Sequence, residues 1–417
     1  SNVKYRVWLL DNNGVEILKT LDTSGLDYTN IDLSDIYDKS LAFGWNWFST
    51  NMSANDMGID NILLSLDDAA TYIKSQSQFS SYYGAAGWIG SLETIDNSSM
   101  YKINLTESSG NITYEGESLT PSEHPLDLAF GWNWISYIPN ESIDINTALS
   151  SIGSDASYIK SQSGYAEYYD GAGWLGIVPT LDPKDGYMIY ADTPTTLTYP
   201  DRSSLARINY ETIDINDNYW ALDYRDFENN GTITITIDKN DFTIEEGDQI
   251  GAFYNNECRG VGFAKDNPIT NNIVFQTMLY GDETYIDMNF KLYDASDNKE
   301  YNLEETVLYH PNIRLNSILE PFLMSRLNTN SLKLDNPYPN PFNPVTTISY
   351  NIPAEMAKVD INIYDVSGRL VENLHNGIQS KGNHKIIWDA SNFSSGIYFV
   401  KLQTNNNTIT KKLILIK

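Results

Sequence analysis

The sequence predicts a mainly β, multidomain chain that contains two repeated β-rich modules with one short helix each, a β-sandwich and a C-terminal β-sandwich. Three observations favour this fold class. Short apolar runs alternate with polar residues and are bounded by Gly, Asn and Ser. One stretch of roughly 80 residues occurs twice, which indicates a repeated structural unit. The length of 417 residues is enough for about two to four domains with cores of their own.

Residues 1–40 precede the repeats. The segment from Tyr5 to Leu9, followed by Gly14, resembles the segment from Tyr101 to Leu105, followed by Gly110. This similarity favours either the end of a preceding repeat or an N-terminal hairpin. The chain starts at Ser1 without an initiator methionine, so we expect it to be processed or to be part of a longer protein.

The two repeats are predicted at residues 41–118 and 119–203, because several motifs return in the same order. Leu41–Trp47 (LAFGWNW) returns unchanged at 128–134, and Tyr72–Ser77 (YIKSQS) returns at 158–163. Apolar residues at spacings of three and four predict a short helix over 59–66 and over 143–152. The GWNW and YIKSQS motifs are expected to be strands, and the following Tyr-Tyr and Gly-Trp-x-Gly segments a hairpin.

The tryptophans of the repeats have two interpretations. Buried tryptophans can form the core of so small a module, and we predict this for the first tryptophan of each GWNW motif; the second ring shares its strand face, which leaves the core open to it too. Exposed rings can instead stack against the apolar face of a sugar. The candidates for such a carbohydrate-binding surface are Trp88, Trp174, Tyr82, Tyr83, Tyr168, Tyr169, Lys74 and Lys160.

Residues 204–330 are predicted to form a separate β-sandwich module. Ile233, Ile235 and Ile237 alternate with threonines, and turn residues separate further strand pairs. The single cysteine, Cys258, excludes an internal disulfide and is expected to be a buried apolar residue. Asp214, Asn216, Asp217 and Asn218 offer oxygen ligands for a weak Ca²⁺ site, with an ordinary acidic surface as the alternative.

Residues 331–417 form the last predicted module. Four prolines between Pro337 and Pro344 require an extended lead-in, because proline lacks a backbone donor. We expect strands over 346–352, 358–364, 369–374, 384–389, 396–403 and 408–416, with a tight turn at Ser367-Gly368. So many short strands in a small module are typical of a sandwich.

This module resembles the C-terminal sorting domain of type IX secretion cargo from Bacteroidetes and related phyla. The resemblance rests on YPNPFNP, INIYDVSGRLV, the segment from Gly382 to Asp389, SSGIYFVKL and TKKLILIK, in that order. It implies an immunoglobulin-like sandwich, export to the cell surface or the medium, and the type IX machinery as a partner. The matching positions are Pro339, Asn340, Pro341, Phe342, Asn343, Pro344, Gly368, Trp388, Asp389, Gly396, Lys411 and Lys412. The tandem repeats loosely resemble uncharacterised repeats of secreted proteins that end in the same domain.

Composition narrows the function. The net charge of −28 argues against nucleic acid as a partner, because phosphate binding needs a basic surface. No run of apolar residues is long enough to span a membrane. Motifs of metalloproteases, serine hydrolases, P-loop enzymes and dinucleotide-binding enzymes are absent. We therefore expect no catalysis and no cofactor.

Two functions remain open from the sequence. The first is a secreted or cell-surface binding or adhesion protein, whose partner is an extracellular glycan or a surface protein. The second is the non-catalytic, carbohydrate-binding C-terminal part of a larger secreted hydrolase. A catalytic domain encoded upstream would favour the second function, and further repeats would favour the first.

Overall fold

The computed structural model describes residues 5–10, 16–21, 35–201, 218–327, 332–404 and 407–417. It confirms the predicted fold class, since nearly all regular structure in these residues is β-strand and the helices are short. The described chain divides into two compact units. The first comprises Ser1–Thr232, Met278–Thr284 and His310–Arg314, and the second comprises Ile233–Thr277, Tyr285–Tyr309 and Leu315–Lys417.

The N-terminal segment contains a pair of antiparallel strands. Strand β1 (Tyr5–Leu10) pairs antiparallel with β2 (Glu16–Leu21). Strand β3 (Asp35–Leu41) then pairs with β10 (Gly110–Ser118), so the fold of the first repeat includes residues before the GWNW motif.

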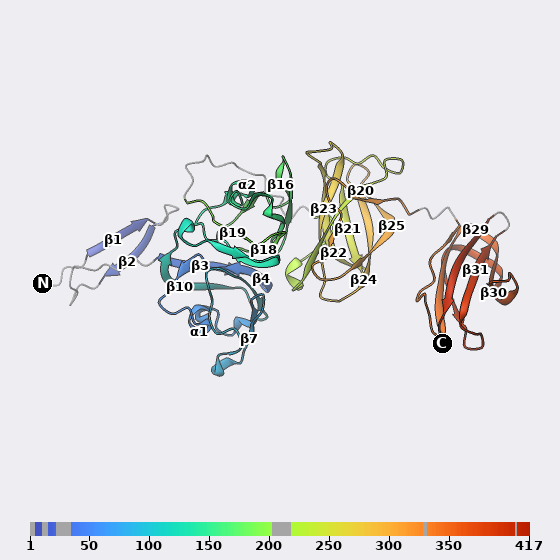
Figure 1. Cartoon of the computed structure of the whole chain (residues 1–417), viewed down its shortest axis with the longest axis horizontal. Coiled ribbons are helices and arrows are strands. Elements are labelled where there is room, and N and C mark those ends of the chain that lie inside the picture. The colour runs from blue at the N-terminus through green and yellow to red at the C-terminus, as the bar shows by residue number, and fades with distance from the viewer. Residues whose placement is uncertain (1–4, 11–15, 22–34, 202–217, 328–331, 405–406) are drawn as a thin grey trace. The chain divides into compact units, whose positions relative to one another are not determined.

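Each repeat is built on a five-stranded sheet of the same strand order, β4-β9-β6-β7-β8 in the first and β12-β18-β14-β15-β16 in the second (Figure 1). The elements of the first are β4 (Gly44–Ser49), β5 (Met52–Ser53), α1 (Ile59–Ile62), η1 (Leu64–Ala69), β6 (Ala70–Lys74), β7 (Phe79–Tyr82), η2 (Gly84–Ala86), β8 (Trp88–Gly90) and β9 (Met100–Leu105). Those of the second are η3 (Pro121–Glu123), β11 (Leu126–Leu128), β12 (Gly131–Ser136), β13 (Ile143–Asp144), α2 (Ile145–Ala148), η4 (Gly153–Asp155), β14 (Ala156–Lys160), β15 (Tyr165–Tyr169), β16 (Gly173–Gly176), β17 (Thr180–Leu181), β18 (Gly186–Ala191) and β19 (Thr195–Leu197).

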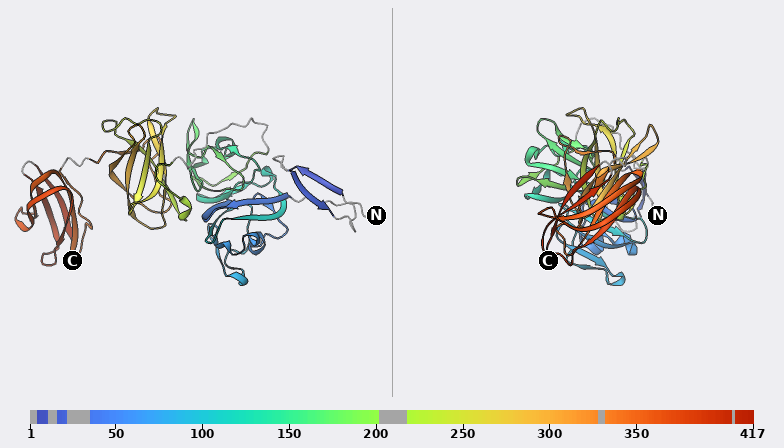
Figure 2. Two further views of the ribbon diagram at one scale, coloured as in Figure 1. Left: turned by 180° about the vertical axis from the view of Figure 1, so that it is seen from behind. Right: turned by 90° about the vertical axis from the view of Figure 1, so that its right-hand side faces the viewer.

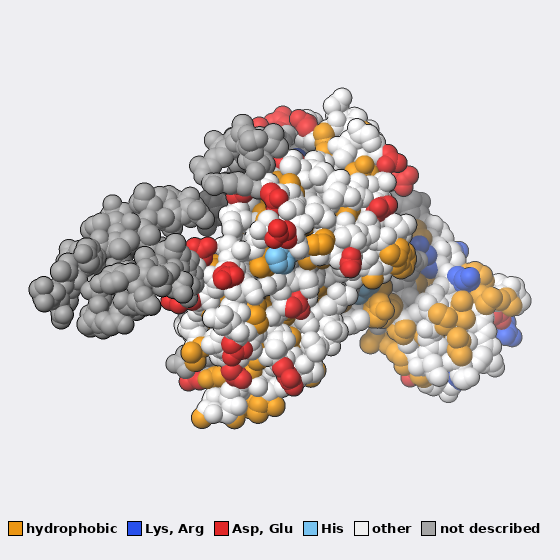
Figure 3. Space-filling model, turned by 60° about the vertical axis from the view of Figure 1, so that its left-hand side comes forward, with side chains coloured by type: hydrophobic (Ala, Val, Ile, Leu, Met, Phe, Trp, Pro, Cys, Tyr) orange, Lys and Arg blue, Asp and Glu red, His pale blue; other side chains and the backbone are white. Residues whose placement is uncertain are grey.

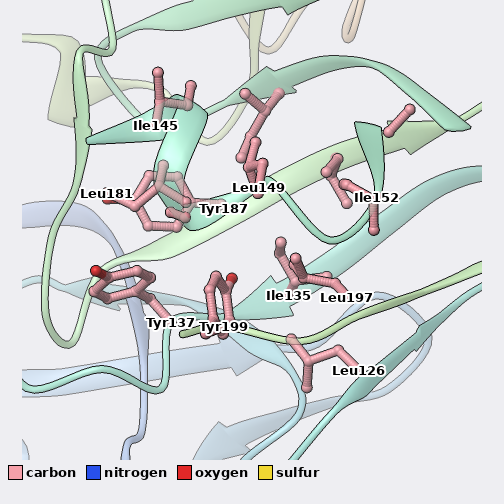
Figure 4. Close-up of a cluster of buried hydrophobic side chains, with 14 of the residues drawn as sticks. Leu126, Ile135, Tyr137, Ile145, Leu149, Ile152, Leu181, Tyr187, Leu197 and Tyr199 are labelled. Atoms are coloured by element: carbon pink, nitrogen blue, oxygen red, sulfur yellow. The ribbon is translucent and has the colours of Figure 1, made fainter. Parts of the chain in front are cut away.

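The predicted helices are shorter than their apolar spacing suggested. In the second repeat, α2 has one turn, and the Asp144 side chain caps it by accepting a hydrogen bond from the Thr147 backbone N–H at 3.1 Å. Ile145, Leu149 and Ile152 of this segment belong to the buried core of the repeat, and Ile145 lies near Tyr187 and Leu181 (Figure 4). The apolar spacing therefore marks the buried face of a helical turn and its flanks rather than of a long helix.

An eight-stranded sheet follows the repeats, with the order β25-β24-β21-β22-β23-β20-β26 and β27 pairing with β20. Its strands are β20 (Asn230–Ile237), β21 (Gln249–Tyr254), β22 (Glu257–Asp266), β23 (Ile273–Tyr280), β24 (Ile286–Asp294), β25 (Lys299–Tyr309), β26 (Arg314–Leu315) and β27 (Phe322–Met324). Ile233, Ile235 and Ile237 are buried as predicted, but Thr232 and Thr234 are buried too. Both faces of this strand are therefore covered, unlike those of a strand with one solvent-facing side.

The C-terminal module consists of strands β28 (Lys333–Leu334), β29 (Val345–Asp365), β30 (Leu370–Asp389), β31 (Gly396–Gln403) and β32 (Thr408–Leu415) (Figure 2). Two pairs of the predicted short strands are in fact continuous. Strand β29 runs through Pro353, and its pairing with β30 shifts register between Ile352 and Met356. A bulge therefore replaces the expected break in the chain.

Candidate functional site

Trp47, Trp132 and Trp134 of the GWNW motifs pack in one cluster between the two repeats rather than in the core of a single repeat, which corrects the sequence prediction for these rings. Trp45 and Trp47 share one face of β4, as expected, whereas Phe48 on the other face is fully buried in the core of the first repeat. Trp47 is 5% exposed and packs in a cluster with Met100 and Met188. Trp132 and Trp134 of the second repeat pack against the same cluster.

Two glutamines join the repeats by an exchange of hydrogen bonds. Gln162 of the second repeat accepts from the Trp47 backbone N–H at 3.1 Å and donates to the Trp45 carbonyl at 2.7 Å. Gln76 of the first repeat accepts from the Trp134 N–H at 2.9 Å and donates to the Trp132 carbonyl at 2.8 Å. Each glutamine side chain therefore pairs with a strand edge as a backbone amide would. The interface is a pseudo-twofold one, because each repeat supplies both a glutamine and a GWNW strand.

Lysine side chains lie beside these tryptophans. The Lys102 ammonium is 4.7 Å from the Trp47 ring centroid and 5.0 Å from that of Trp134, and it donates to the Glu228 carbonyl at 3.0 Å. Such positions over ring faces are attractive for a cation. Burial nevertheless lowers the pKa of Lys102 to about 7, because desolvation outweighs the attraction of Glu228.

This pKa predicts how stability depends on pH. The lysine has a pKa of 10.5 in the unfolded chain and about 7 in the folded one, so between these values the unfolded chain binds more protons. The free energy of unfolding is therefore expected to rise from pH 7 to pH 9.5, by up to about 1.4 kcal/mol per pH unit for one proton. Below pH 7 both states are protonated, and this contribution no longer changes.

Lys102→Met tests whether Lys102 causes this dependence on pH. Methionine is a suitable replacement, because Met188 occupies the equivalent position of the second repeat. We expect it to fold and to lose part of the rise with pH. Urea unfolding followed by tryptophan fluorescence at pH 7.0, 8.0 and 9.5 measures this. The same slope in the variant and the parent would show that Lys102 is not the group responsible.

The two lysines proposed as ligand-binding residues instead bind to partners within the chain. Lys160 is 1% exposed and donates to the side-chain oxygens of Asn230 at 2.8 Å and Asn312 at 2.9 Å. Burial lowers its pKa well below the usual value. Lys74 is half-buried and forms an ion pair with Glu228 at 2.5 Å. Both ammonium groups are therefore committed to partners within the chain.

The Gly-Trp-x-Gly tryptophans occupy the same place in both repeats but differ in exposure. Trp88 is half-buried on β8, where its ring lies 5.3 Å from that of Tyr82. Trp174 is 3% exposed on β16, where its ring lies 5.6 Å from that of Tyr168, inside the core of the second repeat. So buried a ring offers no face to a ligand. Tyr83 is 62% exposed and is the most accessible of the proposed rings, whereas Tyr169 is half-buried.

The proline-rich lead-in of the C-terminal module runs along its last strand. The Asn340 side chain donates to the Lys412 carbonyl at 2.8 Å and accepts from the Ile414 N–H at 2.8 Å. The backbone of Phe342 exchanges hydrogen bonds with Ile414 and Ile416 at 2.9 and 3.0 Å. The lead-in thereby satisfies polar groups at the edge of β32 that would otherwise be open. The adjoining carbonyls of Pro339 and Pro344 accept from Thr346 and Ala390.

Other motif residues of this module have structural roles. Trp388 is fully buried, packs against Phe342, and donates from its indole nitrogen to Glu372 at 2.9 Å. Gly368 has a φ of 78°, which the tight turn between β29 and β30 requires. Asp389 accepts from the Ser391 N–H, and Gly396 begins β31. Among the polar positions Asn343, Lys411 and Lys412, the first and last are exposed and Lys411 is half-buried.

The predicted calcium ligands and Cys258 complete the set of predicted site residues. Asp214, Asn216 and Asp217 lie outside the described residues, and Asn218 is half-buried. Among the residues that the structure describes, no three His, Cys, Asp or Glu side chains are grouped so as to hold a metal ion. Cys258 is buried as expected, and burial raises its pKa to about 11. No helix within the described ranges has the length and apolarity needed to span a membrane.

Sequence reasoning did not predict that the two glutamines and Lys102 lie between the repeats. Gln76 and Gln162 belong to a motif that is identical in both repeats although it extends past the strands β6 and β14 into a loop. Each glutamine makes the same contact with the other repeat, so its identity in both copies was an available sign of a contact between them.

The C-terminal module matches a known family. Residues 336–417 match the secretion system C-terminal sorting domain. Proteins with this domain are secreted or held at the cell surface, and the domain engages the type IX secretion machinery. The match covers only the last module, and no curated protein matches the chain.

Two solved structures show weak likeness. Dimeric latent PorU from Porphyromonas gingivalis is 10% identical, with 91% of this chain and 34% of that chain covered and a TM-score of 0.18. The BSP domain of a biofilm associated protein is 9% identical, with 100% of this chain and 66% of that chain covered and a TM-score of 0.18. The chain thus spans about a third of the PorU chain and just under two thirds of the other. TM-scores this low do not indicate a shared fold.

Proposed function

Given an export domain at the C-terminus, we propose that the preceding modules form a non-catalytic binding or adhesion protein that works at the cell surface or in the medium. The observation that carries this proposal is the sorting domain at residues 336–417, which supplies the destination but no chemistry. The partner is an extracellular glycan or a surface protein, bound through the repeats.

Exposed aromatic residues on the repeats support a binding role. Phe43, Phe79, Tyr83 and Phe130 are each more than half exposed. Large exposed rings cost free energy in water unless a partner covers them. Acidic side chains are spread over the visible face of the molecule rather than gathered into one site (Figure 3). Binding is therefore expected to depend on the rings more than on charge.

The surface of the C-terminal sandwich also carries apolar residues, such as Met356 and Ile378. They lie in the module that engages the export machinery, so we assign them to that contact. The repeats remain the part that meets an external partner.

An adhesion assay tests the proposal. Beads coated with the full chain are expected to bind to polysaccharide-coated or cell-coated surfaces more than beads coated with an unrelated acidic protein. Tyr83→Ala should reduce attachment if this ring takes part, without changing the melting temperature, because the side chain is exposed. Attachment no better than that of the unrelated protein on every surface would contradict the proposal.

A further inference from the structure

Each repeat carries the same set of three aromatic rings on the outer face of its sheet. The first strip consists of Trp45, Tyr72 and Phe79, and the second strip consists of Trp132, Tyr158 and Tyr165. In the first, Trp45 and Tyr72 meet edge to face at 5.9 Å, and Tyr72 stacks on Phe79 at 6.0 Å and 19°. In the second, the corresponding values are 5.7 Å for the edge-to-face pair, and 5.6 Å and 18° for the stacked pair. The two strips are copies of one surface.

The second strip is covered by protein from the same compact unit. Tyr158 and Tyr165 are 0% and 1% exposed, and they pack with Met278 and Tyr280. The Arg314 guanidinium carbon lies 4.0 Å from the Tyr158 ring centroid, and the Tyr158 hydroxyl donates to Thr232 at 2.6 Å. In the second repeat, this arrangement of rings is therefore a surface on which other parts of the chain pack.

The first strip is open. Phe79 is 52% exposed, and Trp45 and Tyr72 are half-buried. The same face of the sheet continues through Ser81 to Ile89, which is 55% exposed. Strands β4 and β7, at either end of the strip, are labelled in Figure 1. A continuous apolar surface of this kind marks a binding site more often than an isolated exposed ring does.

The repeats differ at two positions of the strips, and these differences indicate which ligand the first strip can bind. Glu167, which lies 4.0 Å from Arg314, is replaced at the equivalent position of the first repeat by Ser81. The first strip therefore lacks the carboxylate that pairs with a cation in the second. A neutral ligand suits it better than an arginine from another protein.

Asn104 takes the place that Tyr190 has in the second repeat. It is the cross-strand partner of both Trp45 and Tyr72, so its amide lies between these rings on the same face. Within the part of the chain that the structure describes, neither this amide nor the Tyr72 hydroxyl makes a hydrogen bond, whereas the Tyr158 hydroxyl does. Half-buried polar groups without partners are costly unless water or a ligand satisfies them.

We propose that the first strip binds a neutral sugar ring of an extracellular polysaccharide, an inference that rests on the proposed binding function. A pyranose has an apolar C–H face that can lie on the Tyr72 and Phe79 rings. Its hydroxyls can accept from and donate to the Asn104 amide and the Tyr72 hydroxyl, which supply both donors and acceptors. The ligand needs no charge, since the strip itself carries none. The Lys74–Glu228 ion pair borders the strip next to Phe79.

Calorimetric titration of the full chain tests this. The probes are tetrasaccharides of β-1,4-glucose, α-1,4-glucose, β-1,4-mannose, β-1,4-xylose and α-1,6-mannose. At least one is expected to bind, and Phe79→Ala is expected to weaken that binding about tenfold through loss of the stacking surface. Asn104→Tyr, which introduces the residue found at this position in the second repeat, is expected to abolish sugar binding. Phe130→Ala is the control, because Phe130 is 67% exposed on the second repeat and lies outside both strips.

The outcomes separate this inference from the function on which it rests. Binding that Phe79→Ala weakens and Phe130→Ala does not would support it. Sugar binding that both variants retain, but Tyr83→Ala loses, would overturn the strip as the site and leave the adhesion function standing. Beads that attach to cells through a chain that binds none of the five sugars would overturn the sugar as the ligand. A chain that neither attaches nor binds would overturn both.

Discussion

Replacing Gly186 by methionine, the residue at the equivalent place in the first repeat, is expected to destabilise the packing of the repeats by about 3 kcal/mol, at the upper end of overpacking effects. Gly186 is buried, and a Cβ built on it would lie 2.6 Å from the Met100 Cβ and 2.9 Å from the Phe48 carbonyl oxygen. Real Cβ atoms do not approach backbone atoms so closely, so the two repeats would have to move apart. The methionine of one repeat fits only against the glycine of the other.

Thermal unfolding followed by tryptophan fluorescence measures this effect, because Trp47 and Trp134 lie in the same interface. Gly396→Ala is the control, since a Cβ there would meet nothing closer than 3.9 Å. We expect a clearly lower first transition for Gly186→Met and no change for the control. An unchanged first transition in both would show that the repeats do not pack through these residues.

Trp388→Ala is expected to cost the C-terminal module about 3 to 5 kcal/mol, which is most of the stability of a small domain. The indole is fully buried against Phe342, Phe393 and Tyr398, and the substitution also leaves Glu372 without its donor. Removal of the indole would leave a cavity between three aromatic side chains, so the movement of one of them would not fill it.

The adjacent Ile387 provides the control, because it is 65% exposed on the opposite face of the same strand. Ile387→Ala should change stability by less than about 0.5 kcal/mol. Hydrogen exchange over residues 336–417 distinguishes the two, with fast exchange of β29 to β32 expected only in the tryptophan variant. Equal protection in both variants would mean that Trp388 does not hold the sandwich together.

Local patterns in the sequence were enough for much of the fold. Alternation identified β20, the glycine at 368 identified a turn, and the single cysteine was expected to be a buried apolar residue. Each of these depends on neighbours in the chain. The strand breaks expected between 352 and 358 failed because a proline in a long strand can be absorbed by a bulge, which single-sequence patterns do not reveal.

The candidate site depended on contacts that no local pattern encodes. Gln162 meets Trp45 and Trp47 across more than a hundred residues, and Lys160 meets Asn312 across a still longer separation. Sequence reasoning took Lys160 for a ligand-binding residue because its ammonium group could hydrogen-bond to sugar hydroxyls beside the aromatic rings. The fold buries it beneath polar partners instead. Exposure, more than residue type, decides which aromatic residues can meet a ligand, and exposure follows from packing between modules.

The C-terminal module is expected to deliver the rest of the chain to the outside of the cell. The most direct measurement compares the fraction of chain found outside the cells for the full protein and for a version ending at residue 331, both produced in a bacterium that has a type IX secretion system. We expect the full chain at the surface or in the medium and the shortened chain retained inside. Equal export of both would contradict the account.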